Sequence, residues 1–221
     1  MIKEIYLIRH GETEYNKLAR PIGAEINVPL NETGIQQALK TGQYLRDYRL
    51  VESGTLIPFD IIYSSPMIRT LETANIIKDQ INYAGDIIYD DLLIERKQGK
   101  MTSKKDKLEI KKFKNALNTN DTIANKLNEN AIYHKIEEKF KLGKETDIDV
   151  AARCELFMMK VINSSFNKIA VFTHGSYLTC LLRTIFKVPH ITYGDNCCIS
   201  YMIYDKNGFK LITTPNTQHL I

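Results

Sequence analysis

Short, mostly apolar runs alternate with segments of helical periodicity along the chain. A run of four or five apolar residues that ends at a polar residue is typical of a buried strand, whereas apolar residues at every third or fourth position indicate a helix. Strands are predicted at 5–8, 59–63 and 169–172, and helices at 36–45, 67–77 and 150–162. This alternation favours an α/β fold, and we expect a three-layer αβα sandwich around a mostly parallel central sheet.

The C-terminal third of the chain has two further patterned segments. Residues 177–182 form an apolar stretch that continues the helical pattern. Residues 199–204 and 211–212 are apolar runs on either side of Asn207-Gly208. Because an Asn-Gly pair between apolar runs is a strong turn signal, we expect a hairpin near the C-terminus.

The segment between the second and third predicted strands differs in charge. Residues 96–144 hold 14 lysines and arginines against 6 acidic residues, a net charge of +8, although the whole chain carries only +4. Apolar residues recur there at helical spacing, for example at Ile110, Phe113 and Leu117. We therefore expect a single domain over residues 1–221, with a helical, lysine-rich cap inserted at about 96–146. Such a cap either attracts anions or is only a solvated helical face.

The composition is that of a globular protein, with 43% hydrophobic and 25% charged residues. No apolar run approaches the roughly 18 residues of a membrane span, and the first ten residues are too mixed for a signal peptide. The five histidines form no metal-binding motif, so we expect neither a metal ion nor a cofactor. We expect four reduced core thiols in a cytoplasmic protein, at Cys154, Cys180, Cys197 and Cys198.

Two histidine-glycine pairs follow predicted strands. His10 comes after the first strand, next to Arg9, and His174 comes after the third strand, before Gly175. Ligands of α/β proteins bind at the carboxyl ends of the strands, so we expect both histidines in one site. A neutral imidazole attacks phosphorus and becomes a phosphohistidine, while an arginine fork binds two oxygens of the transferred group. The pattern therefore favours phosphoryl transfer.

Two more segments supply groups that phosphoryl transfer needs. Arg69 lies near the start of a predicted helix, where the backbone amides attract anions. Glu95, just before the inserted segment, is a candidate acid for the leaving oxygen. Purely structural alternatives stay open, because Arg69 could pair with Glu72 and Glu95 with Arg96 at the surface. Three other acidic residues compete with Glu95, namely Glu12, Glu14 and Glu25.

Five ordered blocks of the chain resemble the histidine phosphatase superfamily, in the branch that includes cofactor-dependent phosphoglycerate mutases. The blocks cover nearly the whole chain, and five in order are far more specific than one Arg-His-Gly string. They are Leu7-Ile8-Arg9-His10-Gly11-Glu12-Thr13 with Asn16, Gly23 with Pro29-Leu30 and Gly34, Ser65-Pro66-Met67-Ile68-Arg69 with Thr73-Ala74, Glu95-Arg96 with Gly99, and Thr173-His174-Gly175.

The resemblance implies a role for individual residues. His10 would be the phosphorylated nucleophile, and Glu95 would protonate the leaving oxygen. Family enzymes need no metal ion for this chemistry. The phosphate would be bound by residues within or beside these blocks, namely Arg9, Asn16, Gly23, Arg69, His174, Gly175 and Ser176.

Two departures from the family pattern bear on the reaction. Mutases of this branch continue the fourth block as Glu-Arg-x-Tyr-Gly, whereas this chain has Gln98 in place of the tyrosine. They also present an adjacent arginine pair from the insertion, where this chain has only the lysine pairs Lys104-Lys105 and Lys111-Lys112. A lysine is a point charge rather than a planar fork. Both departures count against a mutase.

We therefore expect a metal-independent phosphomonoester hydrolase of the histidine acid phosphatase type, acting on a small anionic substrate through a phosphohistidine. A cofactor-dependent phosphoglycerate mutase is the first alternative, and a catalytically silent protein that binds polyanions is the second. The cap offers few aromatic side chains for stacking on bases, so nucleic acid is not an expected partner. No membrane partner is expected, and the sequence indicates no oligomeric state.

Overall fold

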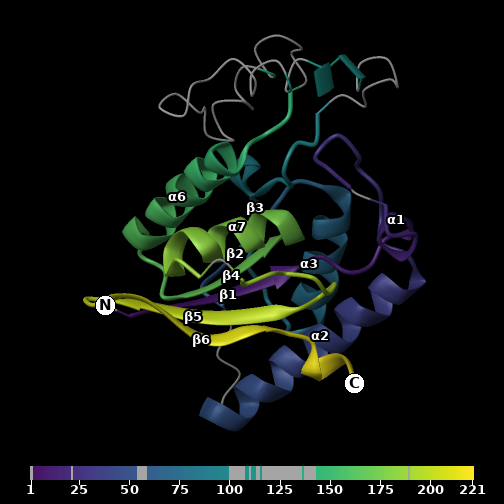
Figure 1. Ribbon diagram of the computed structural model, residues 1–221. Coiled ribbons are helices and arrows are strands. Elements are labelled where there is room, and N and C mark those ends of the chain that lie inside the picture. The colour runs from purple at the N-terminus through teal and green to yellow at the C-terminus, as the bar shows by residue number, and fades with distance from the viewer. Residues whose placement is uncertain are drawn as a thin grey trace.

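A mixed six-stranded sheet forms the centre of the protein, with helices on both of its faces (Figure 1). The computed structural model describes residues 2–20, 22–53, 59–99, 143–188 and 190–221, and positions 108, 109, 111, 112, 115 and 136. The strands are β1 (Lys3–Arg9), β2 (Ile61–Ser64), β3 (Ile87–Tyr89), β4 (Lys168–Thr173), β5 (Ile199–Asp205) and β6 (Gly208–Asn216). The α-helices are α1 (Glu14–Lys17), α2 (Glu32–Ser53), α3 (Ile68–Gln80), α6 (Asp147–Asn163) and α7 (Gly175–Phe186), and two 3-10 helices span Asp91–Leu93 and Gln218–Leu220.

The strand order in the sheet is β3-β2-β4-β1-β5-β6. Strands β3, β2, β4 and β1 run parallel, while β5 is antiparallel to β1 and β6 is antiparallel to β5. The mostly parallel sheet and the C-terminal hairpin are therefore confirmed. Strand β3 was not predicted, because it is a three-residue edge strand in which Ile88 and Tyr89 are exposed.

Strand β1 shows how the three layers are built from alternating side chains. Ile5 and Leu7 face the cluster formed with α6 and α7, whereas Tyr6 and Ile8 face the cluster formed with α2 and α3. All four side chains are buried, as expected for a central strand that is covered on both faces. The three-layer αβα sandwich is confirmed, and the carboxyl ends of its parallel strands converge on one edge.

The two ends of the predicted insertion lie side by side. The Lys97 amide donates to a Glu145 carboxylate oxygen at 2.8 Å, and the Glu145 amide donates to the Lys97 carbonyl at 3.0 Å. Lys111 and Lys112 are helical and exposed, and Ile136 is helical and buried. The Lys104-Lys105 pair and most of the predicted cap lie outside the described residues.

Two further features concern membrane insertion and the cysteines. No helix in the described ranges is long and apolar enough to cross a bilayer. The four cysteines are buried and free of disulfides.

Candidate active site

The paired ends of β1 and β4 bring the two histidines together. Arg9 is the register partner of Thr173 in the parallel ladder, so His10 and His174 leave the sheet at the same edge. Their ring centroids lie 5.3 Å apart, with 62° between the ring planes. Both side chains are almost completely buried.

The hydrogen bonding of His10 fixes its tautomer. Its Nδ1 lies 2.7 Å from the carbonyl oxygen of Gly11. A carbonyl oxygen only accepts, so Nδ1 carries the proton and Nε2 of the neutral ring holds the free lone pair. Burial lowers the pKa of His10 well below its usual 6.5, and the charges of Arg9 and Arg69 lower it further. His10 is therefore a neutral imidazole whose Nε2 is free to act as a nucleophile.

Two arginines beside His10, one half-buried and one fully buried, each have a buried Nε without a partner among the described residues. The Arg9 guanidinium donates to the carbonyl of Gly194, and its buried Nε has no partner among the described residues. Arg69 is fully buried and donates from Nη1 to the Ile26 carbonyl at 2.8 Å, while its Nε also has no partner there. Buried N–H groups without acceptors are costly, so both side chains are suited to an anion that supplies acceptors.

The surface pair between Arg69 and Glu72 is absent among the described residues. The Glu72 carboxylate instead accepts the Leu30 amide at 2.7 Å. Burial lowers the pKa of Arg69 to about 10, which leaves its guanidinium charged at neutral pH.

His174 is held by a serine that precedes α3. Its Nε2 lies 2.8 Å from the hydroxyl oxygen of Ser65, and its buried Nδ1 has no partner in the described part of the chain. Burial lowers the pKa of His174 well below 6.5, and the charge of Arg69 contributes further. The second histidine is therefore neutral at neutral pH and keeps one buried ring nitrogen without a partner in the described part of the chain.

Glu95 is buried at the N-terminus of α7. Its carboxylate accepts the Ser176 amide at 3.3 Å, the Tyr177 amide at 3.2 Å and the Arg96 amide at 2.8 Å. Burial raises the pKa of Glu95, against the opposing effects of the Arg96 and Ser176 amides and of the Arg69 and Arg9 charges. A carboxyl group with a raised pKa is suited to donate a proton.

Arg153 of α6 positions the segment that carries Glu95. Its Nη1 donates to the carbonyls of Leu92 and Ile94 at 2.7 and 3.1 Å, and its Nε pairs with Glu145 at 2.8 Å. Because Leu92 and Ile94 lie just before Glu95, these bonds fix the direction in which the chain enters the site.

The alternative interpretations of the acidic residues are also resolved by their contacts. The Arg96 side chain pairs with Asp147 rather than with Glu95. Glu12 accepts the Asn31 side-chain amide, and Glu25 accepts the amides of Gln98 and Gly99. Glu12, Glu14 and Glu25 do not line the cavity beside His10.

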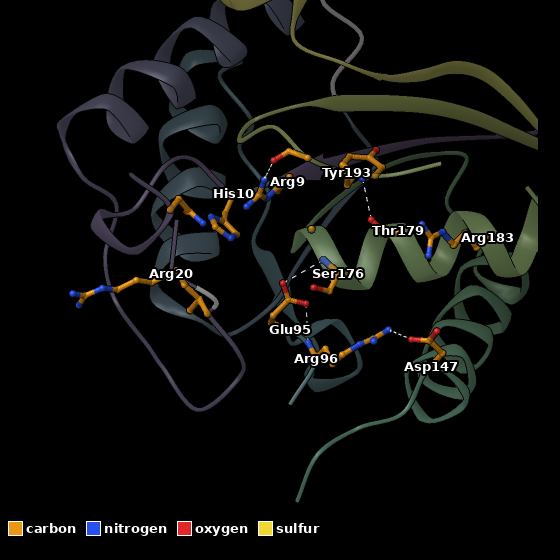
Figure 2. A pocket seen from close by; sticks show the side chains of 14 residues that line it. Arg9, His10, Arg20, Glu95, Arg96, Asp147, Ser176, Thr179, Arg183 and Tyr193 are labelled. Atoms are coloured by element: carbon orange, nitrogen blue, oxygen red, sulfur yellow. Dashed lines mark hydrogen bonds and ion pairs between the residues drawn. The ribbon is translucent and has the colours of Figure 1, made fainter. Parts of the chain in front are cut away.

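A cavity of about 470 Å³ opens beside His10 (Figure 2). Six of the predicted site residues line it, namely Arg9, His10, Asn16, Glu95, Gly175 and Ser176. Arg69 and His174 lie in the protein interior next to them and do not line it. Gly23 does not line it either, because its Cα lies against Glu25 and Gln98 and only the preceding Ile22 reaches the cavity.

Gly175 permits the close approach of Arg9 to α7. A Cβ at this position would lie 3.1 Å from Arg9 Nε and 2.9 Å from the Tyr193 carbonyl oxygen. The absence of a side chain therefore lets the guanidinium lie against the first turn of the helix.

Several lining residues were not predicted from the sequence. Thr179 and Arg183 follow Ser176 on one face of α7, so helical periodicity could have identified them. Asn196 does not line the cavity and had no comparable signal, although its side-chain amide donates to the carbonyls of His10 and Gly11 at 3.0 and 3.1 Å. A group of three or more His, Cys, Asp or Glu residues that could hold a metal ion is not found among the described residues.

Comparisons with known proteins agree with this geometry. The sequence profile described as histidine phosphatase superfamily (branch 1) matches residues 5–217. The chain is 37% identical to the uncharacterized phosphatase PhoE of Bacillus subtilis (strain 168) over a match that covers 35% of each chain. It is 28% identical to the probable phosphoglycerate mutase GpmB of Proteus mirabilis (strain HI4320), over 98% of this chain and 94% of that protein.

A solved structure shares the fold. The phosphoglycerate mutase of Bacillus anthracis (strain Sterne) superposes with a TM-score of 0.73 at 19% sequence identity, over 99% of this chain and 95% of that one. With the family profile covering nearly all of the sequence and both histidines at one sheet edge, the chain belongs to the histidine phosphatase superfamily.

Proposed function

We propose that this protein is a phosphatase that hydrolyses small phosphomonoesters through a phosphohistidine on His10, without a metal ion. The observation that carries the proposal is the 2.7 Å contact between His10 Nδ1 and the Gly11 carbonyl oxygen. That contact leaves Nε2 as the unprotonated nitrogen of a neutral ring. The free cysteines fit a reducing compartment, and we propose that the protein acts in the cytoplasm.

The first half of the reaction transfers the phosphoryl group to the protein. His10 Nε2 attacks phosphorus and forms the P–N bond while the bond from phosphorus to the ester oxygen breaks. Glu95 donates its proton to that oxygen, so the product leaves as a neutral alcohol. Arg9 and Arg69 neutralise the charge on the equatorial oxygens, and the Gly175 amide at the start of α7 adds a further donor.

The second half releases phosphate and restores the free site. Water attacks phosphorus, the P–N bond breaks, and the Glu95 carboxylate accepts a proton from the water. Inorganic phosphate leaves, and His10 returns to its neutral form with Nδ1 still bonded to Gly11. The same carboxyl group therefore acts first as an acid and then as a base.

Hydrolysis is favoured over mutase chemistry by two departures of the sequence from the mutase pattern. A mutase must hold its substrate while the phosphohistidine is shielded from water. Gln98 replaces the tyrosine that mutases have in this block, and the insertion lacks an adjacent arginine pair. The mutase nevertheless stays the second candidate, because the GpmB relative matches over 98% of this chain.

An assay of the purified protein distinguishes these functions. We expect steady release of the aryl alcohol and inorganic phosphate from an aryl phosphate, and little isomerisation of 3-phosphoglycerate with bisphosphoglycerate present. Isomerisation that outruns phosphate release would identify a mutase. Tight RNA binding with no turnover would favour the polyanion-binding alternative. His10→Ala should abolish turnover, whereas His190→Ala should not, because His190 is exposed and lies outside the cavity.

A further inference from the structure

Three residues of α7 extend the cavity away from His10. Ser176, Thr179 and Arg183 all line it, and they share one face of the helix. A helix rises 1.5 Å per residue, so Arg183 lies about 10 Å along the axis from Ser176. Figure 2 shows this arrangement, with Arg9 and His10 beyond the Ser176 end and Arg183 at the opposite end.

Arg183 is oriented by the loop that also orients Arg9. Its Nε donates to the Ile191 carbonyl at 3.1 Å, and its two terminal nitrogens have no partner among the described residues. Arg9 donates to the Gly194 carbonyl, three residues further along the same loop. The Tyr193 amide donates to the Thr179 hydroxyl at 2.9 Å and ties this loop to α7. One backbone segment thus fixes two guanidinium groups at separate ends of one cavity.

The other charged groups that line the cavity are less available than Arg183 to bind an anion at this end. Arg96, on the facing wall, is paired with Asp147, so the charges of these two side chains largely cancel. Glu95 is bound by backbone amides at the other end of the cavity. Arg20 also lines the cavity, but its side chain extends away from the other labelled residues (Figure 2). Arg183 is therefore the cation best placed to receive an anion at this end.

The cavity does not end at Arg183. A neighbouring cavity of about 290 Å³ shares four lining residues with the first, namely Arg96, Asp147, Thr179 and Arg183. A ligand that reaches Arg183 from His10 therefore has room for a terminal group beyond the guanidinium.

We propose that Arg183 binds a second anionic group of the substrate, at the end of the cavity that lies about 10 Å along α7 from Ser176 and farthest from the phosphoryl group at His10. The substrate class is an elongated phosphomonoester with a carboxylate or phosphate at its far end. A guanidinium fork binds either oxyanion through two nitrogens, so the shared chemistry is the anion and the distance. The position of the first phosphoryl group rests on the proposed function.

Phosphonates test this subsite without turnover, because their C–P bond is not hydrolysed. Calorimetry would compare hexane-1,6-bisphosphonate and 6-phosphonohexanoate, which carry two anions, with hexylphosphonate, which carries one. Ethane-1,2-bisphosphonate has two anions that are too close together to span the cavity. The proteins are the wild type, Arg183→Gln, and Arg46→Gln as a matched control that removes an exposed arginine on α2.

Arg183→Gln should weaken the binding of hexane-1,6-bisphosphonate about 10- to 100-fold, as expected for the loss of a hydrogen bond between charged groups. The affinity for hexylphosphonate and for the ethane bisphosphonate should stay within about twofold, which also shows that the variant is folded. Arg46→Gln should change none of these affinities. The affinity for 6-phosphonohexanoate shows whether the second anion can be a carboxylate as well as a phosphate.

The proposal is overturned by any of three results. The first is an unchanged affinity of Arg183→Gln for hexane-1,6-bisphosphonate. The second is a loss of affinity for hexylphosphonate as large as the loss for the bisphosphonate. The third is no measurable binding of the bisphosphonate to the wild type. Turnover of an aryl phosphate is measured separately. If the wild type binds the phosphonates in an Arg183-dependent way but turns over no aryl phosphate, the hydrolase proposal fails and the subsite stands.

Discussion

The imidazole rings of His10 and His174 lie 5.3 Å apart and inclined by 62°, because their strands are neighbours in the sheet. Both rings are buried beside Arg9 and Arg69, which lowers the pKa of each histidine well below 6.5. The site therefore carries its positive charge on the arginines and keeps both imidazole rings neutral, as the proposed nucleophile must be. This division of roles is what phosphoryl transfer to a nitrogen requires.

Replacing the proposed acid should slow the hydrolysis of phosphate esters to an extent that depends on the leaving group. Glu95→Gln keeps the size of the side chain and one accepting oxygen, but it has no acidic proton to donate. Turnover of an alkyl phosphate should fall about 10²- to 10⁴-fold, which is the usual contribution of general acid catalysis to the rate. An aryl phosphate, whose leaving oxygen needs little protonation, should lose far less. Equal losses for the two esters in steady-state assays would argue against an acid role for Glu95.

The pH dependence of kcat/KM should be bell-shaped. The pKa of His10 is lowered, so its neutral form persists below pH 6.5 and is lost only as the pH falls through the lowered value. The pKa of Glu95 is raised, so its acid form persists above pH 4.5 and is lost as the pH rises through the raised value. The alkaline limb should therefore disappear in Glu95→Gln. An alkaline limb that survives unchanged in that variant would assign it to another group.

Adding a methyl group at Gly175 should impair phosphate binding. A Cβ there would lie 3.1 Å from Arg9 Nε and 2.9 Å from the Tyr193 carbonyl, so the guanidinium must move. We expect Gly175→Ala to lower kcat/KM about 10- to 100-fold, since small displacements of a positioning group are costly. Gly194→Ala is the comparison, because its Cβ would meet no atom within 4 Å. Equal activities of the two variants would contradict this account of Gly175.

Arg153 should contribute strongly to stability. Its side chain and that of Glu145 are 16% and 13% exposed, and it also binds two carbonyls of the segment before Glu95. Arg153→Gln should lower the free energy of unfolding by about 3 kcal/mol, because it leaves a largely buried carboxylate unpaired. Urea denaturation would measure the change. Arg46→Gln breaks a more exposed pair and should cost less than about 1 kcal/mol, so similar losses would count against this contribution.

The chain's sequence predicts the layers of the fold because those depend on local patterns. The apolar run at 5–8 identifies a strand buried on both faces, and it lies within β1. Strand β3 has no such signal, since its pairing with β2 is a tertiary contact and two of its three residues are exposed. Short edge strands depend on their neighbours rather than on their own residues.

The same distinction applies to the site. Arg9 and His10 belong to one continuous block, so the sequence alone identifies them. Asn196 contacts that block, and Arg153 contacts the segment before Glu95, from distant parts of the chain through hydrogen bonds to backbone carbonyls. Because every residue has a backbone carbonyl, a hydrogen bond to that carbonyl does not constrain the type of the accepting residue. Such partners can therefore be identified only in the folded structure.

Trapping the phosphorylated protein tests the central claim most directly. The enzyme would be mixed with a phosphomonoester, quenched under denaturing alkaline conditions that preserve phosphohistidine, and mapped by tandem mass spectrometry. The account predicts one phosphoryl group on His10 during turnover, none in His10→Ala, and an unchanged signal in His190→Ala. Phosphorylation of a different residue, or continued turnover by His10→Ala, would contradict it.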